Sequence, residues 1–143
     1  MKIFLKRLND DYHFETRNER GHVIHLDNKS ETLQPKGASP MELLLMGIAG
    51  CSGIDIVMIL KKQQVEIKDL QMEVIGTRRG EGAVPNTFTG IHVKVELEGD
   101  MSENKAQRAA DLSFEKYCSV AKMLEKAAEV TYEVHLNGTP LQK

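Results

Sequence analysis

Two cysteines are the residues in this sequence whose type and position best suit redox chemistry. Cys51 lies in the middle of the apolar stretch SPMELLLMGIAGCSGIDIVMILKKQQ, and Cys118 lies between two shorter helical patterns. A buried free cysteine is most often only a small hydrophobic residue, and the helix dipole does not acidify a thiol about a dozen residues into a helix. Cys118 differs, because a cysteine that caps a helix lies beside amide groups that favour its thiolate. Spacing alone does not show that the two residues meet.

A thiol in an apolar site needs a nearby cation to form the reactive thiolate. The candidates are two pairs of arginines in loops or at strand ends, Arg17 and Arg20 in TRNERGH, and Arg78 and Arg79 in TRRGEG. Each is equally consistent with a solvated surface charge. The sequence leaves open which arginine, if any, activates a cysteine.

The histidines do not predict a metal site. His22 and His25 lie three apart in a strand pattern, and an odd separation places side chains on opposite faces of a strand. His92 falls on the polar side of the alternating segment IHVKVELEG, which predicts a solvent-facing residue. We expect no metal ligands among these residues.

The stretch around Cys51 predicts one long helix that begins near its serine. Ser39, Pro40 and Glu42 form a capping box, with proline at the first helical position and glutamate reaching back to the cap amide. Residues 43–54 carry no charge, so the helix must be buried on every side, which a chain of 143 residues can hardly do alone. A membrane span fits the length, but Asp55 and the glycines favour a buried helix of a soluble protein.

Three glycines in this helix, Gly47, Gly50 and Gly53, need compensation. Each weakens an isolated helix by up to about 1 kcal/mol relative to alanine. We expect the close approach of another backbone to offset this cost.

The remaining patterns predict short strands and two further helices. Strand patterns cover residues 2–7, 11–16, 22–27, 65–78, 91–99 and 130–136, and helical patterns cover residues 102–118 and 119–128. The first of these helices should bury Ala106, Ala109, Ala110, Phe114 and Tyr117. This order is typical of an α+β fold with antiparallel pairing, and no linker divides it, so we expect a single domain over residues 1–143.

Composition excludes several classes of partner. Nineteen basic and 21 acidic residues give a formal charge of −2, so no bulk field attracts nucleic acid or an anionic membrane. The N-terminal stretch MKIFLKRLNDDYHF lacks the apolar core of a signal peptide, which favours a cytosolic location. In that reducing compartment a pair of cysteines is more typical of catalysis or sensing than of structure.

The segments GASPMELLLMGIAGCSGID and YCSVAKML resemble the two signature regions of the OsmC/Ohr family of thiol-dependent peroxidases. In that family an N/S-P-x-E-L segment precedes a cysteine in a long central helix, and a second cysteine follows downstream in a C-P/S-V context. The resemblance covers nearly the whole chain. It implies an OsmC-like α+β fold in which antiparallel sheets surround the central helix of an intertwined homodimer.

The resemblance also implies a reaction. Cys51 would be the peroxidatic residue that attacks a hydroperoxide, and Cys118 would resolve the resulting sulfenic acid as a disulfide. An external thiol, in some members a lipoylated protein, would then reduce that disulfide. No metal or bound organic cofactor is implied. The alternative is a non-enzymatic OsmC-like dimer that binds a small molecule or senses redox state.

Two positions depart from the family pattern. Met41 stands where the hydroperoxide-resistance branch places a glutamate that pairs with a catalytic arginine, and Glu42 is accounted for by the capping box. Glu19 aligns with the arginine itself, which leaves Arg17 or Arg20 to replace it. These departures indicate a separate OsmC-like subgroup, with weaker peroxidase activity or another electrophile as substrate.

Overall fold

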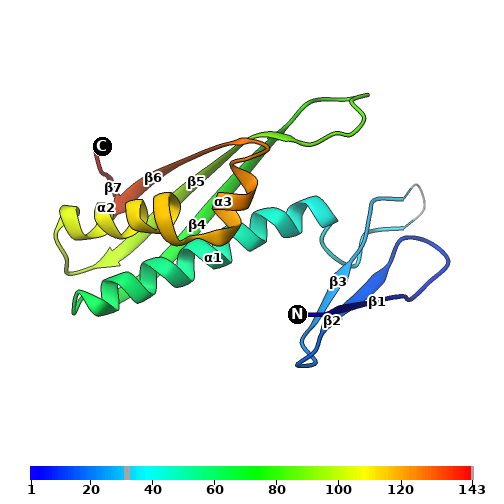
Figure 1. Cartoon of the computed structure of the whole chain (residues 1–143), viewed down its shortest axis with the longest axis horizontal. Helices are drawn as coiled ribbons and strands as arrows, with labels where there is room; N and C mark the ends of the chain where they lie inside the picture. Colours follow the sequence, from blue (N-terminus) through cyan, green and yellow to red (C-terminus); the bar gives the residue numbers. More distant parts are fainter. Residues whose placement is uncertain (31–32, 143) are drawn as a thin grey trace. The chain divides into compact units, whose positions relative to one another are not determined.

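A computed structural model describes residues 1–30 and 33–142, and the chain forms two compact units (Figure 1). Unit 1 is Met1–Leu44 and unit 2 is Leu45–Lys143. The long helix α1 (Pro40–Lys62) begins in unit 1 and continues through unit 2.

Unit 1 contains a three-stranded antiparallel sheet in the order β1 (Ile3–Arg7), β2 (Phe14–Asn18) and β3 (Val23–Leu26). All three strands are predicted by the sequence, but β2 begins later than residue 11. The reason is the side chain of Asn9, which accepts the amides of Asp11 and His13 and holds these residues in the turn. Every side chain of β1 is exposed, so the sheet carries apolar residues without cover.

The start of α1 follows from its sequence. The Ser39 amide donates to Glu42 Oε2 at 2.7 Å, and the Glu42 amide donates to Ser39 Oγ at 3.3 Å, which confirms the capping box. The bond from the Ser39 amide holds the pKa of Glu42 below its usual range. Glu42 is therefore engaged as a helix cap.

Unit 2 contains a four-stranded sheet in the order β4 (Ile67–Arg78), β5 (Phe88–Gly99), β6 (Glu129–Leu136) and β7 (Thr139–Pro140). The prediction of antiparallel pairing is correct for β4 with β5 and for β6 with β7, but β5 and β6 pair in parallel. The cause is the connection between them, which consists of α2 (Glu103–Leu112), the π-helical turn η1 (Ser113–Tyr117) and α3 (Ser119–Leu124). A helical crossover of this length returns the chain in the same direction.

The core of unit 2 lies between the sheet and its helices, which cover one face (Figure 1). The predicted alternation in β5 is confirmed, because Ile91, Val93, Val95 and Leu97 are buried. The helix α2 starts at its predicted cap, Ser102, and its three predicted alanines are buried. Phe114, in η1, is buried as well, as predicted. Tyr117 was predicted to be buried but is 50% exposed, because the wider π-helical turn moves it off the buried face.

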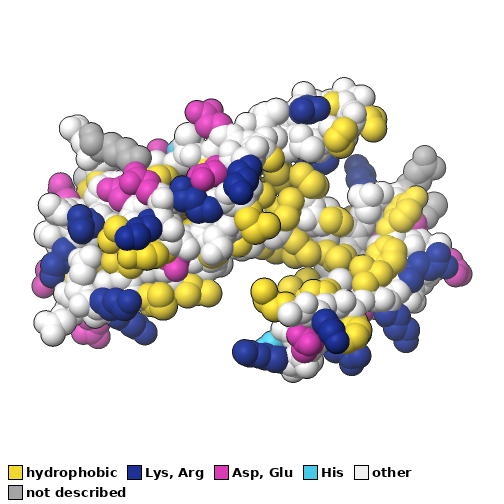
Figure 2. Space-filling view, in the orientation of Figure 1, with side chains coloured by type: hydrophobic (Ala, Val, Ile, Leu, Met, Phe, Trp, Pro, Cys, Tyr) yellow, Lys and Arg dark blue, Asp and Glu magenta, His cyan; other side chains and the backbone are white. Residues whose placement is uncertain are grey.

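The two sides of α1 have different environments. Ile48, Ile56 and Leu60 are fully buried, whereas Ile54 and Met58 are 64% and 48% exposed. Figure 2 shows hydrophobic side chains gathered on the surface of the molecule. The prediction of burial on every side is therefore not met within one chain. By length and composition α1 could cross a membrane, with a mean hydropathy of 2.2, a property it shares with core helices of soluble proteins.

Among residues 1–30 and 33–142, the atoms nearest to the glycines of α1 do not belong to the backbone of another element. A Cβ at Gly47 or Gly53 would have only side-chain atoms near it, at 3.8 Å, and one at Gly50 would meet nothing within 4 Å. The predicted close approach is therefore not made within the described part of the chain.

Candidate active site

The structure brings the two cysteines together. The sulfur atoms of Cys51 and Cys118 and a carboxylate oxygen of Asp55 all lie within 4.8 Å of one another. Both cysteines are free thiols, with Cys51 half-buried on α1 and Cys118 fully buried after η1. A short movement would allow their sulfurs to bond.

The position of Cys118 depends on the π-helical turn before it. Its amide donates to the Ser113 carbonyl at 2.8 Å, and its sulfur accepts the amide of Ala121 at 3.4 Å. The predicted capping role is therefore confirmed. The predicted thiolate of Cys118 is not confirmed, because burial raises the pKa of Cys118 to about 12, and Cys51 and Asp55 raise this pKa further. The thiol of Cys118 is thus held protonated at neutral pH.

Two serines join α1 to the element that carries Cys118. Ser52, next to Cys51, is fully buried and its hydroxyl donates to the Ile48 carbonyl at 2.7 Å. The hydroxyl of Ser113, also fully buried, reaches the Ser52 carbonyl at 3.3 Å. The Ser113 bond links η1 to α1 beside the cysteines, whereas the Ser52 hydroxyl bond lies within α1.

Asp55 is the site residue that the sequence did not predict. It follows Cys51 by four residues, which places both side chains on one face of the helix. Burial raises the pKa of Asp55, and a Ser113 hydrogen bond partly offsets this. Its Oδ2 atom is buried without a hydrogen-bond partner. The four-residue spacing of Cys51 and Asp55 was the signal that could have indicated this pair. That spacing does not show that Cys118 lies beside the same face of α1.

Two of the four predicted arginines lie in unit 1, and the other two, Arg78 and Arg79, lie at and directly after the end of β4 in unit 2. Arg17 is exposed in β2, and Arg20 lies in the turn that follows. In unit 2, Arg78 donates to the carbonyl of Asn86 at the end of β4. Within the described part of unit 2, no arginine donates a hydrogen bond to either cysteine.

A groove of 390 Å³ extends from the site. It is lined by Asp55, Met58, Ile59, Lys62, Gln63, Leu112 and Tyr117. Pockets of this volume and apolar lining are typical of small-molecule sites.

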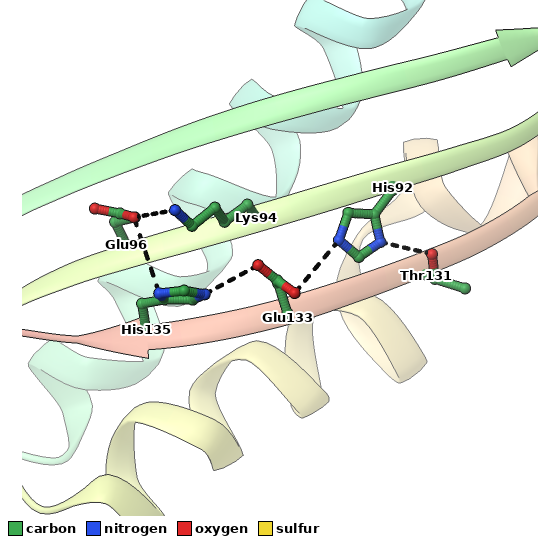
Figure 3. A network of polar contacts seen from close by, with 6 residues as sticks. All are labelled: His92, Lys94, Glu96, Thr131, Glu133 and His135. Carbon is green, nitrogen blue, oxygen red and sulfur yellow. Dashed lines mark hydrogen bonds and ion pairs between the residues drawn. The ribbon is translucent and has the colours of Figure 1, made fainter. Parts of the chain in front are cut away.

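A second cluster of ionisable residues lies on the outer face of the sheet (Figure 3). It joins six side chains from β5 and β6: His92, Lys94, Glu96, Thr131, Glu133 and His135. Glu133 bridges the two histidines, at 3.8 Å from His92 and 2.9 Å from His135. His92 is on the polar face, as predicted, but it also bonds the Thr131 hydroxyl at 2.8 Å. This cluster is a partly exposed network in which each carboxylate lies beside a basic residue.

Comparison with known proteins identifies the family. The model of the OsmC-like protein family matches residues 33–133. Protein YhfA of Escherichia coli K12 is 44% identical over 117 residues, which cover 80% of this chain and 84% of that protein.

Solved structures show the same fold. A hypothetical protein from Aquifex aeolicus VF5 is 32% identical with a TM-score of 0.78, over 95% of this chain and 96% of that one. The organic hydroperoxide resistance protein OhrB of Bacillus subtilis is 21% identical with a TM-score of 0.63, over 94% and 96% of the two chains, a likeness of fold alone. The α+β fold expected from the sequence is therefore confirmed, and the chain belongs to the OsmC-like protein family.

Proposed function

We propose that this protein is a cytosolic thiol-dependent peroxidase that reduces organic or small hydroperoxides through Cys51 and Cys118. The observation that carries the proposal is the meeting of the two sulfurs within 4.8 Å. Membership of the OsmC-like family and the shared fold with a hydroperoxide resistance protein support a peroxide-related redox role.

The reaction balances with these two residues and an external reductant. The Cys51 thiolate attacks one peroxide oxygen, the O–O bond breaks, and the alkoxide leaves as an alcohol after taking a proton. The sulfur of Cys118 then attacks the sulfenic sulfur of Cys51, and hydroxide leaves as water with the Cys118 proton. A dithiol, such as a lipoyl group, reduces the disulfide by exchange and is itself oxidised.

The environments of the two cysteines suit different roles. Cys51 is half-buried and therefore accessible to a small peroxide, whereas Cys118 is fully buried. Because burial raises the pKa of Cys118 to about 12, this thiol is a poor first nucleophile. Cys118 can attack once Cys51 is a sulfenic acid, since the Cys51 sulfur that it attacks is then already adjacent. The apolar groove beside Asp55 supplies a path for the organic part of the substrate.

The cation that activates Cys51 comes from Arg17 or Arg20 in this proposal. The carboxylate expected to orient that arginine is replaced by Met41, and Glu42 is engaged by Ser39. Replacing either arginine with alanine should slow alkylation of Cys51 by iodoacetamide at pH 7. Arg78→Ala is the matched control, because the Arg78 guanidinium is held by a backbone carbonyl. Equal rates in the Arg17 and Arg20 variants and in the wild type would remove both residues from the mechanism.

The proposed assembly is a homodimer in which a second copy covers the exposed side of α1. Ile54 and Met58 on α1 are exposed in unit 2, and Ile3 and Leu5 on β1 are exposed in unit 1. Exposed apolar residues on one element are typical of interfaces. The open surface at Gly50 would admit a second helix. Light scattering after size exclusion should give twice the 16.1 kDa chain mass. A stable monomer, or a dimer that survives Ile54→Lys unchanged, would contradict this assembly.

A second candidate function is a redox sensor or small-molecule-binding protein without turnover. The observation in its favour is Asp55, because a carboxylate beside the cysteines opposes formation of a thiolate. The two functions differ in whether the thiols react catalytically.

The experiment that tests the peroxidase follows consumption of cumene hydroperoxide with dihydrolipoamide as the reductant. The wild type should turn over, and Cys51→Ser should not. In Cys118→Ser, one equivalent of peroxide should leave a sulfenic acid on Cys51 that dimedone traps. The absence of both turnover and trapped sulfenic acid, in folded and fully reduced protein, would contradict the peroxidase.

A further inference from the structure

Three potential metal ligands converge at one point in unit 2. Cys51 and Asp55 are one helical turn apart on α1, and Cys118 comes from the junction of η1 and α3. Their ligand atoms lie within 4.8 Å of one another. Two thiolates bound to one tetrahedral zinc ion, with Zn–S bonds of about 2.3 Å, lie roughly 3.8 Å apart, so the cluster matches this size with small side-chain adjustments.

The charge environment of Asp55 favours a cation at this point. Its Oδ2 atom is buried and has no hydrogen-bond partner. Over residues 1–30 and 33–142, no ion pair joins Asp55 to a basic side chain. A partly buried carboxylate that faces two thiols must hold a proton or meet a positive charge. A metal ion would supply that charge and also convert both thiols to thiolates.

The donor set selects the class of metal. Calcium and magnesium take oxygen ligands, whereas two thiolates and one carboxylate suit zinc. Three protein ligands leave a fourth tetrahedral position for water or another small ligand. Of these three ligands, Asp55 lines the neighbouring groove.

We propose that reduced Cys51 and Cys118, together with Asp55, form a Zn²⁺ site in this protein. Binding releases one proton from each thiol and forms two zinc–sulfur bonds and one zinc–oxygen bond. Peroxide and zinc then compete for the same sulfurs. A hydroperoxide takes two electrons from the two thiolates and, with two protons, becomes an alcohol and water, while the sulfurs join in a disulfide. The disulfide no longer offers thiolate ligands, so Zn²⁺ leaves. The site would couple metal occupancy to the redox state of the cysteines.

The test uses reduced full-length protein and Co²⁺ as a spectroscopic probe for Zn²⁺. One Co²⁺ per chain should bind, with a thiolate-to-cobalt charge-transfer band and the intense visible bands of a tetrahedral site. Zn²⁺ should displace it stoichiometrically. Cys51→Ser and Cys118→Ser should each lose most of the charge-transfer intensity, and the disulfide form should bind no metal. Cobalt binding is measured without peroxide turnover, so failure of the zinc site and failure of the peroxidase are distinguished.

The role of Asp55 is tested by the isosteric variant Asp55→Asn. Its Zn²⁺ affinity, measured by competition with a chromophoric chelator, should fall at least about tenfold. Asp69→Asn is the matched control, because Asp69 is an exposed carboxylate in β4 and should leave the affinity unchanged. Absence of stoichiometric binding to the reduced wild type would overturn the proposal. An Asp55→Asn variant with wild-type affinity and spectrum would also overturn it.

Discussion

Two clusters of ionisable side chains in unit 2 contrast sharply in how their charges are balanced. On the outer face of the sheet, Glu133 lies between His92 and His135, and each carboxylate has a basic neighbour (Figure 3). On the helix-covered side, Asp55 faces the thiols of Cys51 and Cys118 without a basic partner among the described residues. The first arrangement is complete within the chain, whereas the second leaves a charge for a substrate, proton or metal to balance.

The comparison also shows what burial adds to residue type. In the exposed network, solvent screens each pair, so the individual contacts contribute little to stability. In the cysteine cluster, burial raises the pKa values of Cys118 and Asp55 and makes their protonation state sensitive to what binds. Chemistry is therefore expected at the buried cluster and not at the exposed one.

The largest expected effect is loss of the thiol reaction. Cys51→Ser should reduce the rate of cumene hydroperoxide consumption at least about a thousandfold, because the reacting sulfur is removed. His92→Gln changes the exposed network and should keep the wild-type rate. A stopped-flow measurement of peroxide decay compares the two. A large loss of the peroxide consumption rate in His92→Gln would show that the exposed network also takes part in the reaction.

The elements of this site were predictable to different degrees. Local signals were sufficient for the Ser39 cap of α1 and for the capping position of Cys118, because each depends on residues within one helical turn. The alternating pattern was sufficient for the two faces of β5. These features need no information from distant parts of the chain.

Other features depended on how distant elements pack. The meeting of Cys51 with Cys118 depends on the π-helical turn and on packing of η1 against α1, where the Ser113 hydroxyl bonds the Ser52 carbonyl, and no periodicity encodes either. The exposure of Tyr117 follows from the same turn. Parallel pairing of β5 with β6 depends on the whole helical crossover. The role of Asp55 depends on its place beside Cys51 and Cys118 in space, and the local sequence around Asp55 does not encode the position of Cys118.

The next effect concerns the difference between the two thiols. In Cys51→Ser, the remaining Cys118 should be alkylated at least about 100-fold more slowly when folded than when unfolded in urea at pH 8, because the raised pKa and burial both suppress the thiolate. The folded rate should still be rising at pH 9.5. The measurement is the rate of iodoacetamide modification by mass spectrometry. Equal folded and unfolded rates would show that Cys118 is not shielded.

A smaller effect is expected in the pH dependence of stability. Because the pKa of Asp55 is raised above 3.8 in the folded chain, the folded state binds more protons than the unfolded state just above that pH. The free energy of unfolding therefore falls as pH rises through the interval between the two values. With EDTA present, Asp55→Asn should raise Tm by about 1–3 °C at pH 7. Below pH 4 the same variant should leave Tm unchanged.

Thermal melts across this pH range give the measurement, and Asp69→Asn again serves as the control. A gain at pH 7 in both variants would assign the effect to net charge. A lower Tm for Asp55→Asn at pH 7 would show that the carboxylate stabilises the fold, contrary to the account of an uncompensated charge.

The smallest effect is expected at the exposed network. Glu133→Gln should change the free energy of unfolding by less than about 1 kcal/mol, because exposed ion pairs are screened by solvent. It should leave both the metal affinity and the peroxide reaction unchanged. Urea denaturation measures this, and a loss of several kcal/mol would show that the network supports the sheet.

The central claim is that Cys51 and Cys118 act as one redox pair. Reduced protein should receive one equivalent of cumene hydroperoxide, followed by alkylation of free thiols and peptide mapping by mass spectrometry. The account predicts a Cys51–Cys118 disulfide within the chain and a mass loss of two hydrogens. Two free thiols after minutes of exposure, in protein whose unfolded form does react, would contradict the account.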